Sequence, residues 1–169
     1  MAGARPRFAA DAMLGSLARW LRLLGYDTTY ERDAPDERVV QLAQAQGRVV
    51  LTRDRAVARR AGASLFVASH DLEGQMAEVF AWLGLEVPAK IALERCSVCN
   101  ARLVPADAAA ARQAGVPDRV LGSKDTFWRC PGCRRVYWEG THVASMGLRL
   151  SRVRAREPGN PPGGPTTVK

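Results

Sequence analysis

Four cysteines stand in two C-x2-C pairs in the second half of the chain. Cys96 and Cys99 form the first pair, and Cys130 and Cys133 form the second, 30 residues further on. A C-x2-C turn holds two thiolates at about the separation that tetrahedral zinc requires, and two such turns complete a closed, structural site. The alternatives are two disulfides or four unrelated thiols. A chain without a secretion signal favours zinc over disulfides.

A second group of residues that could do chemistry is acidic. Asp11, Asp36 and Asp54 each follow a short apolar run or open the segment after one. Hydrolysis of a phosphodiester with Mg²⁺ or Mn²⁺ needs hard oxygen ligands around one or two ions. Each acid also has a structural explanation, because Asp11 and Asp54 could cap helices, and Asp36 and Glu37 suit a helix's first turn. Their occurrence at successive strand exits favours the metal-binding interpretation.

The elements that must position these acids alternate along the first half of the chain. Strands are predicted over residues 7–10, 27–30, 48–51 and 64–67. Helices are predicted over residues 14–24, 36–46, 54–61 and 72–83. This alternation predicts an α/β fold with a mostly parallel sheet and helices on both faces. Sites in such sheets form beyond the carboxyl ends of the strands, where the acids stand.

The chain divides into three parts by composition. Residues 1–92 form the predicted α/β domain, and residues 93–150 form a small zinc module whose apolar spacing is too weak for a core of its own. Residues 151–169 are rich in Pro, Gly and Arg, so we expect a disordered tail. No apolar run approaches the roughly 20 residues of a membrane-spanning helix. We expect a cytoplasmic protein with no membrane partner.

The net charge of +8 is unevenly distributed. Residues 1–95 carry a net charge of +1, and residues 96–169 carry +7. A strongly basic chain points to an anionic partner, most often a nucleic acid. The neutral, carboxylate-rich half suits a metal-dependent nuclease better than a simple nucleic-acid binder.

Basic and aromatic residues are interleaved around the second cysteine pair. Arg129, Arg134 and Arg135 stand there among four aromatic residues, an arrangement that suits phosphate contact and base stacking. The alternative is a small aromatic core with a solvated basic face. Arg19 and Arg22 lie one turn apart on the first predicted helix and could either clamp a phosphate or face solvent.

Several joined motifs carry a resemblance to a known family. In chain order they are FAADAMLGSLARWLRLLGYDT, the acidic pair Asp36 and Glu37, GRVVLTRDR, CSVCN and FWRCPGCRRVYWEGTH. From about Phe8 to His142 the chain resembles the Mut-seven C-terminal ribonuclease family. The resemblance implies a PIN-like three-layer α/β/α domain followed by a zinc ribbon. It also implies RNA cleavage with Mg²⁺ or Mn²⁺ bound by three or four acidic residues.

The resemblance also assigns individual residues. The catalytic acids that it implies are Asp11, Asp36, Asp54 and Asp71. Glu37 is a rival of Asp36 as a ligand of the catalytic metal, and Glu73 is a rival of Asp71 as the fourth acid. A missing fourth acid would imply a one-metal site or a weakened enzyme. The residues that we expect to contact RNA are Arg19, Arg22, Arg53, Arg129, Arg134, Arg135 and His142. For His142, a structural hydrogen bond is the alternative.

We therefore predict a metal-dependent ribonuclease with structural zinc, catalytic Mg²⁺ or Mn²⁺, and a zinc ribbon that assists RNA binding. RNA is the expected partner, and the sequence does not identify any protein partners. The rival prediction is a non-catalytic RNA- or ribosome-binding adaptor that uses the ribbon. A phosphatase with an aspartyl nucleophile is a weaker rival. Such an enzyme would carry D-x-D after the first strand, whereas Asp11 is followed by Ala12 and Met13.

Overall fold

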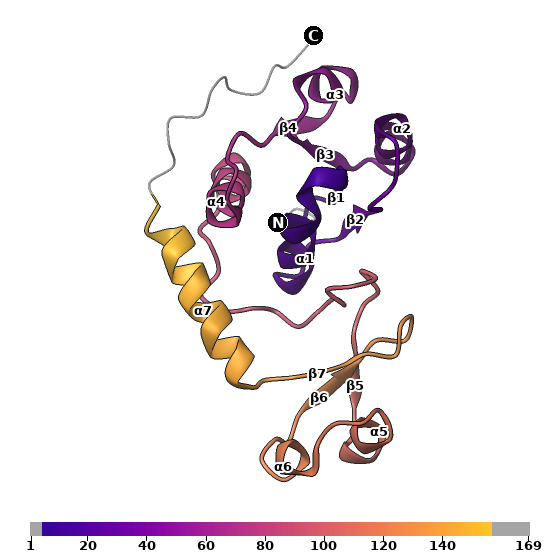
Figure 1. Cartoon of the computed structure of the whole chain (residues 1–169), viewed down its shortest axis with the longest axis vertical. Coiled ribbons are helices and arrows are strands. Elements are labelled where there is room, and N and C mark those ends of the chain that lie inside the picture. The colour runs from indigo at the N-terminus through magenta and orange to yellow at the C-terminus, as the bar shows by residue number, and fades with distance from the viewer. Residues whose placement is uncertain (1–4, 157–169) are drawn as a thin grey trace.

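The structure is a computed structural model that describes residues 5–156, except for the side chains of residues 141–144. Two parts follow one another along the chain (Figure 1). We call them the α/β unit (residues 5–93) and the cysteine module (residues 94–140). A last helix runs back from the cysteine module to the α/β unit (Figure 1). None of the helices in the described residues has both the length and the apolar character needed to cross a bilayer.

The α/β unit alternates strands and helices as the sequence predicts. Its strands are β1 (Phe8–Ala10), β2 (Thr28–Tyr30), β3 (Val49–Thr52) and β4 (Ser64–Phe66). Its helices are the 3-10 turn η1 (Ala12–Leu14) and α1 (Gly15–Leu23), α2 (Asp36–Gln46), α3 (Arg55–Arg60) and α4 (Leu72–Leu83). Gly47, which follows α2, adopts the left-handed φ of 60° that ends a helix without steric cost.

All four strands run parallel in the order β2-β1-β3-β4. From β1 the chain crosses to one side through α1, and from β2 it crosses back through α2 to β3. Right-handed crossovers in opposite directions place their helices on opposite faces of the sheet. The loops after β1 and β3 diverge at the point where the direction reverses, and ligands of such sheets bind at that point. The predicted fold class is confirmed, with helices on both faces of a parallel sheet.

Two apolar clusters pack on the two faces of the sheet. Phe8, Ala10 and Leu51 face α1 and α4, and Ala9 and Val50 face α2 and α3. Successive strand residues point to opposite faces, which accounts for this alternation. The two layers of helices hold the strand ends in fixed positions.

The cysteine module contains a three-stranded antiparallel sheet. Its elements are β5 (Val104–Ala106), α5 (Ala108–Gln113), α6 (Asp118–Leu121), β6 (Phe127–Arg129) and β7 (Val136–Trp138). The expectation that this half lacks a core was wrong, because Ala111, Val116 and Phe127 form a small buried cluster. The two short helices between β5 and β6 supply the apolar side chains that the cysteine turns lack.

The last helix, α7 (Thr141–Arg154), belongs to the α/β unit by its packing. Leu150 and Val153 are buried in the same cluster as residues of α1 and α4. Residues 151–154 were expected to open a disordered tail, but they are the last turn of this helix. Burial of Val153 in the cluster that also contains residues of α4 accounts for the difference. Residues 157–169 of the expected tail lie outside the described part of the chain.

Candidate active site and cysteine cluster

Asp11 follows β1 and is buried, with 4% of its surface exposed. Its Oδ1 accepts the N–H of Met13 at 2.9 Å, which caps η1, and its Oδ2 accepts the N–H of Arg53 at 3.1 Å. Tyr30 steadies the same turn by donating its hydroxyl to the carbonyl of Ala12 at 3.2 Å. The Asp11 carboxylate is therefore held between the exits of β1 and β3.

Asp54 follows β3 and is exposed. Its own N–H donates to Oγ1 of Thr52 at 2.9 Å, and its Oδ1 accepts the N–H groups of Ala56 at 2.5 Å and Val57 at 3.1 Å. Asp54 therefore caps α3, which is the structural role that the sequence offered as the alternative to metal binding. The N–H groups of Val57 and Ala56 hold the pKa of Asp54 below its ordinary value. Both cap bonds use Oδ1, so Oδ2 is not engaged by them.

Arg53 connects these two acids to the exit of β4. One Nη of Arg53 lies 2.8 Å from Nδ1 of His70. The Nε of Arg53 is buried and, within the described residues, has no hydrogen-bond partner. A buried donor without a partner is uncommon in folded proteins. The guanidinium is thus held against His70, while the backbone N–H of the same residue bonds Asp11.

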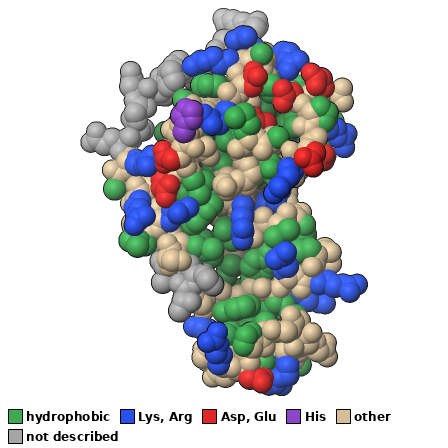
Figure 2. Space-filling view, viewed as in Figure 1, with side chains coloured by type: hydrophobic (Ala, Val, Ile, Leu, Met, Phe, Trp, Pro, Cys, Tyr) green, Lys and Arg blue, Asp and Glu red, His purple; other side chains and the backbone are tan. Residues whose placement is uncertain are grey.

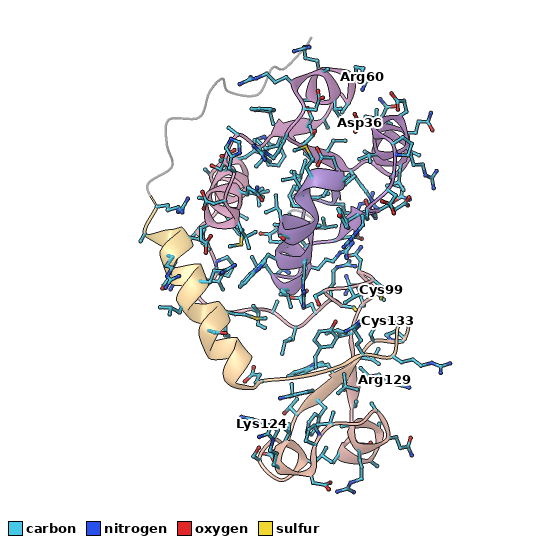
Figure 3. The ribbon with its side chains drawn as sticks, in the orientation of Figure 1. Asp36, Arg60, Cys99, Lys124, Arg129 and Cys133 are labelled. Carbon is cyan, nitrogen blue, oxygen red and sulfur yellow. The ribbon has the colours of Figure 1, made fainter. Side chains whose placement is uncertain are left out.

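Asp36 and Glu37 both lie in the first turn of α2, where the helix dipole favours acidic residues. Asp36 is half-buried, and Glu37 forms an exposed ion pair with Arg60 of α3 at 3.3 Å. The backbone N–H of Glu37 and the Arg60 guanidinium lower the pKa of the Glu37 carboxyl. Figure 3 shows Asp36 and Arg60 at the same end of the α/β unit.

The two candidates for the fourth acid are both paired with arginines of the C-terminal segment. Asp71 caps α4 by accepting the N–H of Gly74 at 3.1 Å, and its Oδ1 lies 2.8 Å from a guanidinium nitrogen of Arg156. That arginine, then the N–H of Gly74, lower the pKa of Asp71. Glu73 pairs with Arg149 at 3.2 Å. Neither acid is free of a cation in this structure.

The structure joins Asp11 and the Asp54 turn but does not gather all the predicted acids. Among the described residues, only the four cysteines form a group of three or more Cys, His, Asp or Glu ligand atoms within 4.8 Å of one another. No closed cage of three carboxylates is therefore present in the part of the chain that the structure describes. A divalent ion at the strand exits would have to complete its coordination with water and substrate.

The four cysteine Sγ atoms do meet in one cluster. Cys96 and Cys133 lie 3.4 Å apart and Cys99 and Cys130 lie 3.2 Å apart, and all four are free of disulfides. A tetrahedron with metal–sulfur bonds of about 2.3 Å has sulfur–sulfur edges of about 3.8 Å, close to this spacing. The cluster could hold a metal such as zinc.

The two cysteine turns have the same backbone geometry. Asn100 and Arg134 each follow the second cysteine of a turn, and their N–H groups donate to the carbonyls of Cys96 and Cys130, both at 3.0 Å. Asn100 and Arg134 adopt left-handed φ angles of 69° and 64°. The repeated geometry brings the two pairs of thiols face to face.

One thiol is prepared for ligation by its neighbours. Burial raises the pKa of Cys96, but the Tyr137 hydroxyl, 3.1 Å away, and the N–H groups of Cys99 and Val98 outweigh burial and lower it to about 6. Burial, and then the bond to Cys96, raise the pKa of Tyr137 to about 12. Metals bind the thiolate form of cysteine, so these donors favour metal binding.

The first cysteine turn is joined to the α/β unit by Arg22. Its Nε donates to the carbonyl of Thr28 at 2.8 Å, and its Nη1 donates to the carbonyls of Val98 at 2.7 Å and Ser97 at 3.2 Å. Arg22 is only 5% exposed. Arg22, expected from the sequence to contact RNA, is thus buried with its Nε and Nη1 engaged inside the protein, and it links the two parts of the chain.

Asp27 and Asn100 complete the same junction. Nδ2 of Asn100 donates to Asp27 at 2.8 Å, and its Oδ1 accepts the N–H of Thr28 at 3.1 Å. Asp27 also pairs with Arg48 at 2.6 Å and with Arg95 at 3.3 Å. Burial raises the pKa of Asp27, but Arg48 and Asn100 outweigh it, so that the pKa falls below its ordinary value. The cysteine module thus docks at the amino end of β2, whereas Asp11 and Asp54 stand at the carboxyl ends of β1 and β3.

Three of the predicted RNA-contacting arginines line one groove between the two parts. The groove has a volume of about 390 Å³. Arg19 lines it from α1, and Arg134 and Arg135 line it from the second cysteine turn. Figure 3 shows Cys99 and Cys133 at this junction and Arg129 further along the module. Arg129 is exposed on β6 and does not line the groove. The side chain of His142 lies outside the described residues.

Comparison with known families agrees with this geometry. The Mut7-C RNAse domain matches residues 6–150, which is most of the chain. The chain belongs to the Mut7-C family. This membership confirms the resemblance seen in the sequence and indicates a ribonuclease-type function. No curated protein and no solved structure matches the chain.

Two contacts of this Mut7-C chain near its candidate sites were not anticipated from the sequence. The first is the pair of Arg53 and His70, which belong to different strand exits. The second is Asp27, whose carboxylate joins three residues of two parts of the chain. Asp27 stands directly before β2, and the only sequence signal for its role was an acidic residue at the start of a predicted strand.

Proposed function

We propose that the chain is a metal-dependent ribonuclease that hydrolyses RNA phosphodiester bonds at the carboxyl edge of its parallel sheet. The observation that supports this most is the Asp11 carboxylate. It is buried at the divergence of the β1 and β3 loops and bonded to the backbone of the turn that carries Asp54. Membership of an RNase family supports the same substrate.

The donors at this edge fit a hydrated Mg²⁺ or Mn²⁺. Mg²⁺ usually keeps several waters and is bound through one or two carboxylates plus substrate phosphates. Asp11 and Asp54 would be those carboxylates, with Asp36 or Glu37 approaching from α2. A bound divalent ion polarises the phosphate and lowers the pKa of attacking water. Arg53, whose guanidinium lies against His70 at the exit of β4, would contact the phosphate from the protein side.

The four cysteines would hold structural zinc, as their spacing and chemistry suggest. Four protein ligands leave no position for water, so this ion would not take part in hydrolysis. Its role would be to shape the cysteine module, which would assist RNA binding. The Asp71 carboxylate remains our fourth acid, and it would take part only after release from Arg156.

A second candidate is a non-catalytic RNA- or ribosome-binding adaptor. It is favoured by one observation, the absence of a three-carboxylate cage among the described residues. An adaptor would need the cysteine module and its arginines but not Asp11 or Asp54.

RNA cleavage with added Mg²⁺ or Mn²⁺ separates the two candidates. We expect wild-type cleavage, and a loss of about a hundredfold or more in Asp11→Asn and Asp54→Asn, because each removes a metal ligand. Asp107→Asn is the matched control, since Asp107 caps α5 through the N–H of Ala110. Equal cleavage by all four proteins would exclude the proposed site. Absence of wild-type cleavage on varied RNA substrates would favour the adaptor.

A further inference from the structure

The groove between α1 and the cysteine module is lined by basic and neutral residues. Its lining consists of Arg19, Ser97, Val98, Ala114, Cys133, Arg134, Arg135, Val136 and Tyr137. No carboxylate is among these residues. Figure 2 shows Lys and Arg side chains across the junction of the two parts, while most Asp and Glu side chains on this face lie towards the α2 and α3 end.

The three arginines of the groove are unpaired in the part of the chain that the structure describes. None of the ion pairs formed by described residues includes Arg19, Arg134 or Arg135. Seven other arginines within residues 5–156 do pair with carboxylates. Their positions are Arg5, Arg48, Arg60, Arg95, Arg112, Arg149 and Arg156. Three guanidinium groups in one groove without an acid form a site for an anion with several negative charges.

Arg134, which lines the groove, has an energetically unfavourable backbone conformation. Its φ of 64° is in the left-handed region, which Gly and Asn adopt most readily. Asn100 occupies the matching position of the first turn. A bulky charged residue in this conformation is an outlier that suggests a functional requirement for its side chain.

The negative charge of a metal-bound cysteine cluster would not cancel the positive charge of the groove arginines. Zn²⁺ with four thiolates carries two net negative charges, which would attract nearby cations. Arg22 already lies against the first cysteine turn from inside the protein, where it donates to the carbonyls of Ser97 and Val98. Arg22 offsets part of this negative charge from the buried side. The three groove arginines outweigh the remainder, so the surface that faces solvent stays positive.

We propose that this groove binds the phosphodiester backbone of a single RNA strand, with Arg19, Arg134 and Arg135 contacting its phosphates. This rests on the proposed function and deepens it, because it places substrate binding on both parts of the chain. Arg19 is the fifth residue of α1, which follows the turn that Asp11 caps, so about 6 Å of helix separates Arg19 from the start of α1 at 1.5 Å per residue. A strand in the groove can therefore follow α1 to the strand exits.

The test measures RNA binding in a background that does not cleave. A fluorescein-labelled short oligouridine is titrated with Asp11→Asn protein, and anisotropy is followed at several salt concentrations. Each of Arg19→Gln, Arg134→Gln and Arg135→Gln is expected to raise Kd about threefold or more at moderate salt. The triple variant is expected to lower the salt slope by about 2, at about 0.7 per phosphate contact on a single strand. Arg119→Gln, an exposed arginine of α6 outside the groove, is the matched control.

Zinc content and circular dichroism of every variant show whether it is folded. The triple Arg-to-Lys variant adds a second check, since it keeps the charges and should retain most of the salt slope. Unchanged Kd and slope in the folded triple-Gln variant would overturn the proposal. Loss of zinc with unchanged RNA binding would also overturn it, because the arginines would then only balance the thiolates. Weakened binding in a protein whose wild type does not cleave RNA would support the groove while rejecting the nuclease.

Discussion

The backbone N–H of Arg53 donates to Oδ2 of Asp11 across 3.1 Å. This bond joins the exits of β1 and β3, which are neighbouring strands of the sheet. Oδ1 of the same carboxylate caps η1 through Met13. Asp11 therefore has a structural role whether or not it also binds a metal, and experiments must separate the two.

Replacement of Asp11 by Ala should destabilise the protein more than replacement by Asn. Alanine leaves the N–H groups of Met13 and Arg53 without acceptors, at a cost of about 1–3 kcal/mol, whereas Asn keeps one acceptor oxygen. Urea unfolding of both variants measures the difference. Asp107→Ala, which removes only the α5 cap, should cost about 1 kcal/mol. An Asp11→Ala variant as stable as wild type would contradict the bonding described here.

Arg22→Met should lower both stability and metal retention. The carbonyls of Thr28, Ser97 and Val98 would lose their donor in a buried place, and we expect a loss of about 2–4 kcal/mol. Arg22→Lys keeps the charge but not the forked donors, so it should be intermediate. Chemical unfolding and the rate of zinc transfer to a coloured chelator check this. Wild-type values in both variants would show that the junction contributes little.

Removal of the metal should loosen the first residue of β2. The N–H of Thr28 donates to Asn100, whose backbone is part of the first cysteine turn. In Cys96→Ser, or after chelation of zinc, hydrogen exchange at the Thr28 amide should accelerate at least about tenfold. The internal control is the amide of Val67, which donates to the carbonyl of Thr52 at 2.8 Å. This bond is not part of the junction. Equal acceleration at both amides would indicate global unfolding instead.

Asp27 should make the protein sensitive to acid. Its pKa in the folded state lies below the ordinary value of 3.8, because the bonds from Arg48 and Asn100 outweigh burial. The stability that it contributes is therefore fully present above about pH 4 and is lost as the pH falls through the lowered pKa. Asp27→Asn should cost about 1 kcal/mol or more at pH 7 and flatten the loss of stability at acid pH.

Stability curves of wild type, Asp27→Asn and Asp118→Asn between about pH 2 and pH 7 test this. Asp118 forms an ion pair whose acid is 88% exposed, and such pairs contribute little. An acid limb in Asp27→Asn as steep as in wild type would assign the acid sensitivity to other groups.

Local patterns in the sequence predicted the elements of the α/β unit closely. Leu14, Leu17 and Leu21 repeat at helical spacing and are buried as predicted, and the short apolar runs are the four parallel strands. The four cysteines were also predictable as one cluster, because a C-x2-C turn determines its own geometry. Such features depend on residues that are close together in the sequence, so local sequence patterns are sufficient to predict them.

Arg19 and Arg22 show where the sequence was insufficient. They lie one turn apart and looked equivalent, yet Arg22 is buried against carbonyls more than 70 residues away in sequence, and Arg19 lines an open groove. Which of two neighbouring side chains is buried depends on what packs over the helix, and that is decided by distant segments. The same reason applies to α7, because the composition of its last turn predicted a disordered tail, whereas Val153 of that turn is buried in the cluster that contains residues of α4.

The fold class, the family and the grouping of the four cysteines were predictable from the amino-acid sequence, because they follow from periodicity and from motifs with fixed internal geometry. The docking of the cysteine module at the amino end of β2, opposite the edge with Asp11 and Asp54, was not predictable in this way. Nor was it predictable which arginines of the described residues lack an acidic partner. Both are outcomes of long-range packing, in which the burial of one charge depends on whether a partner from elsewhere in the chain can satisfy it.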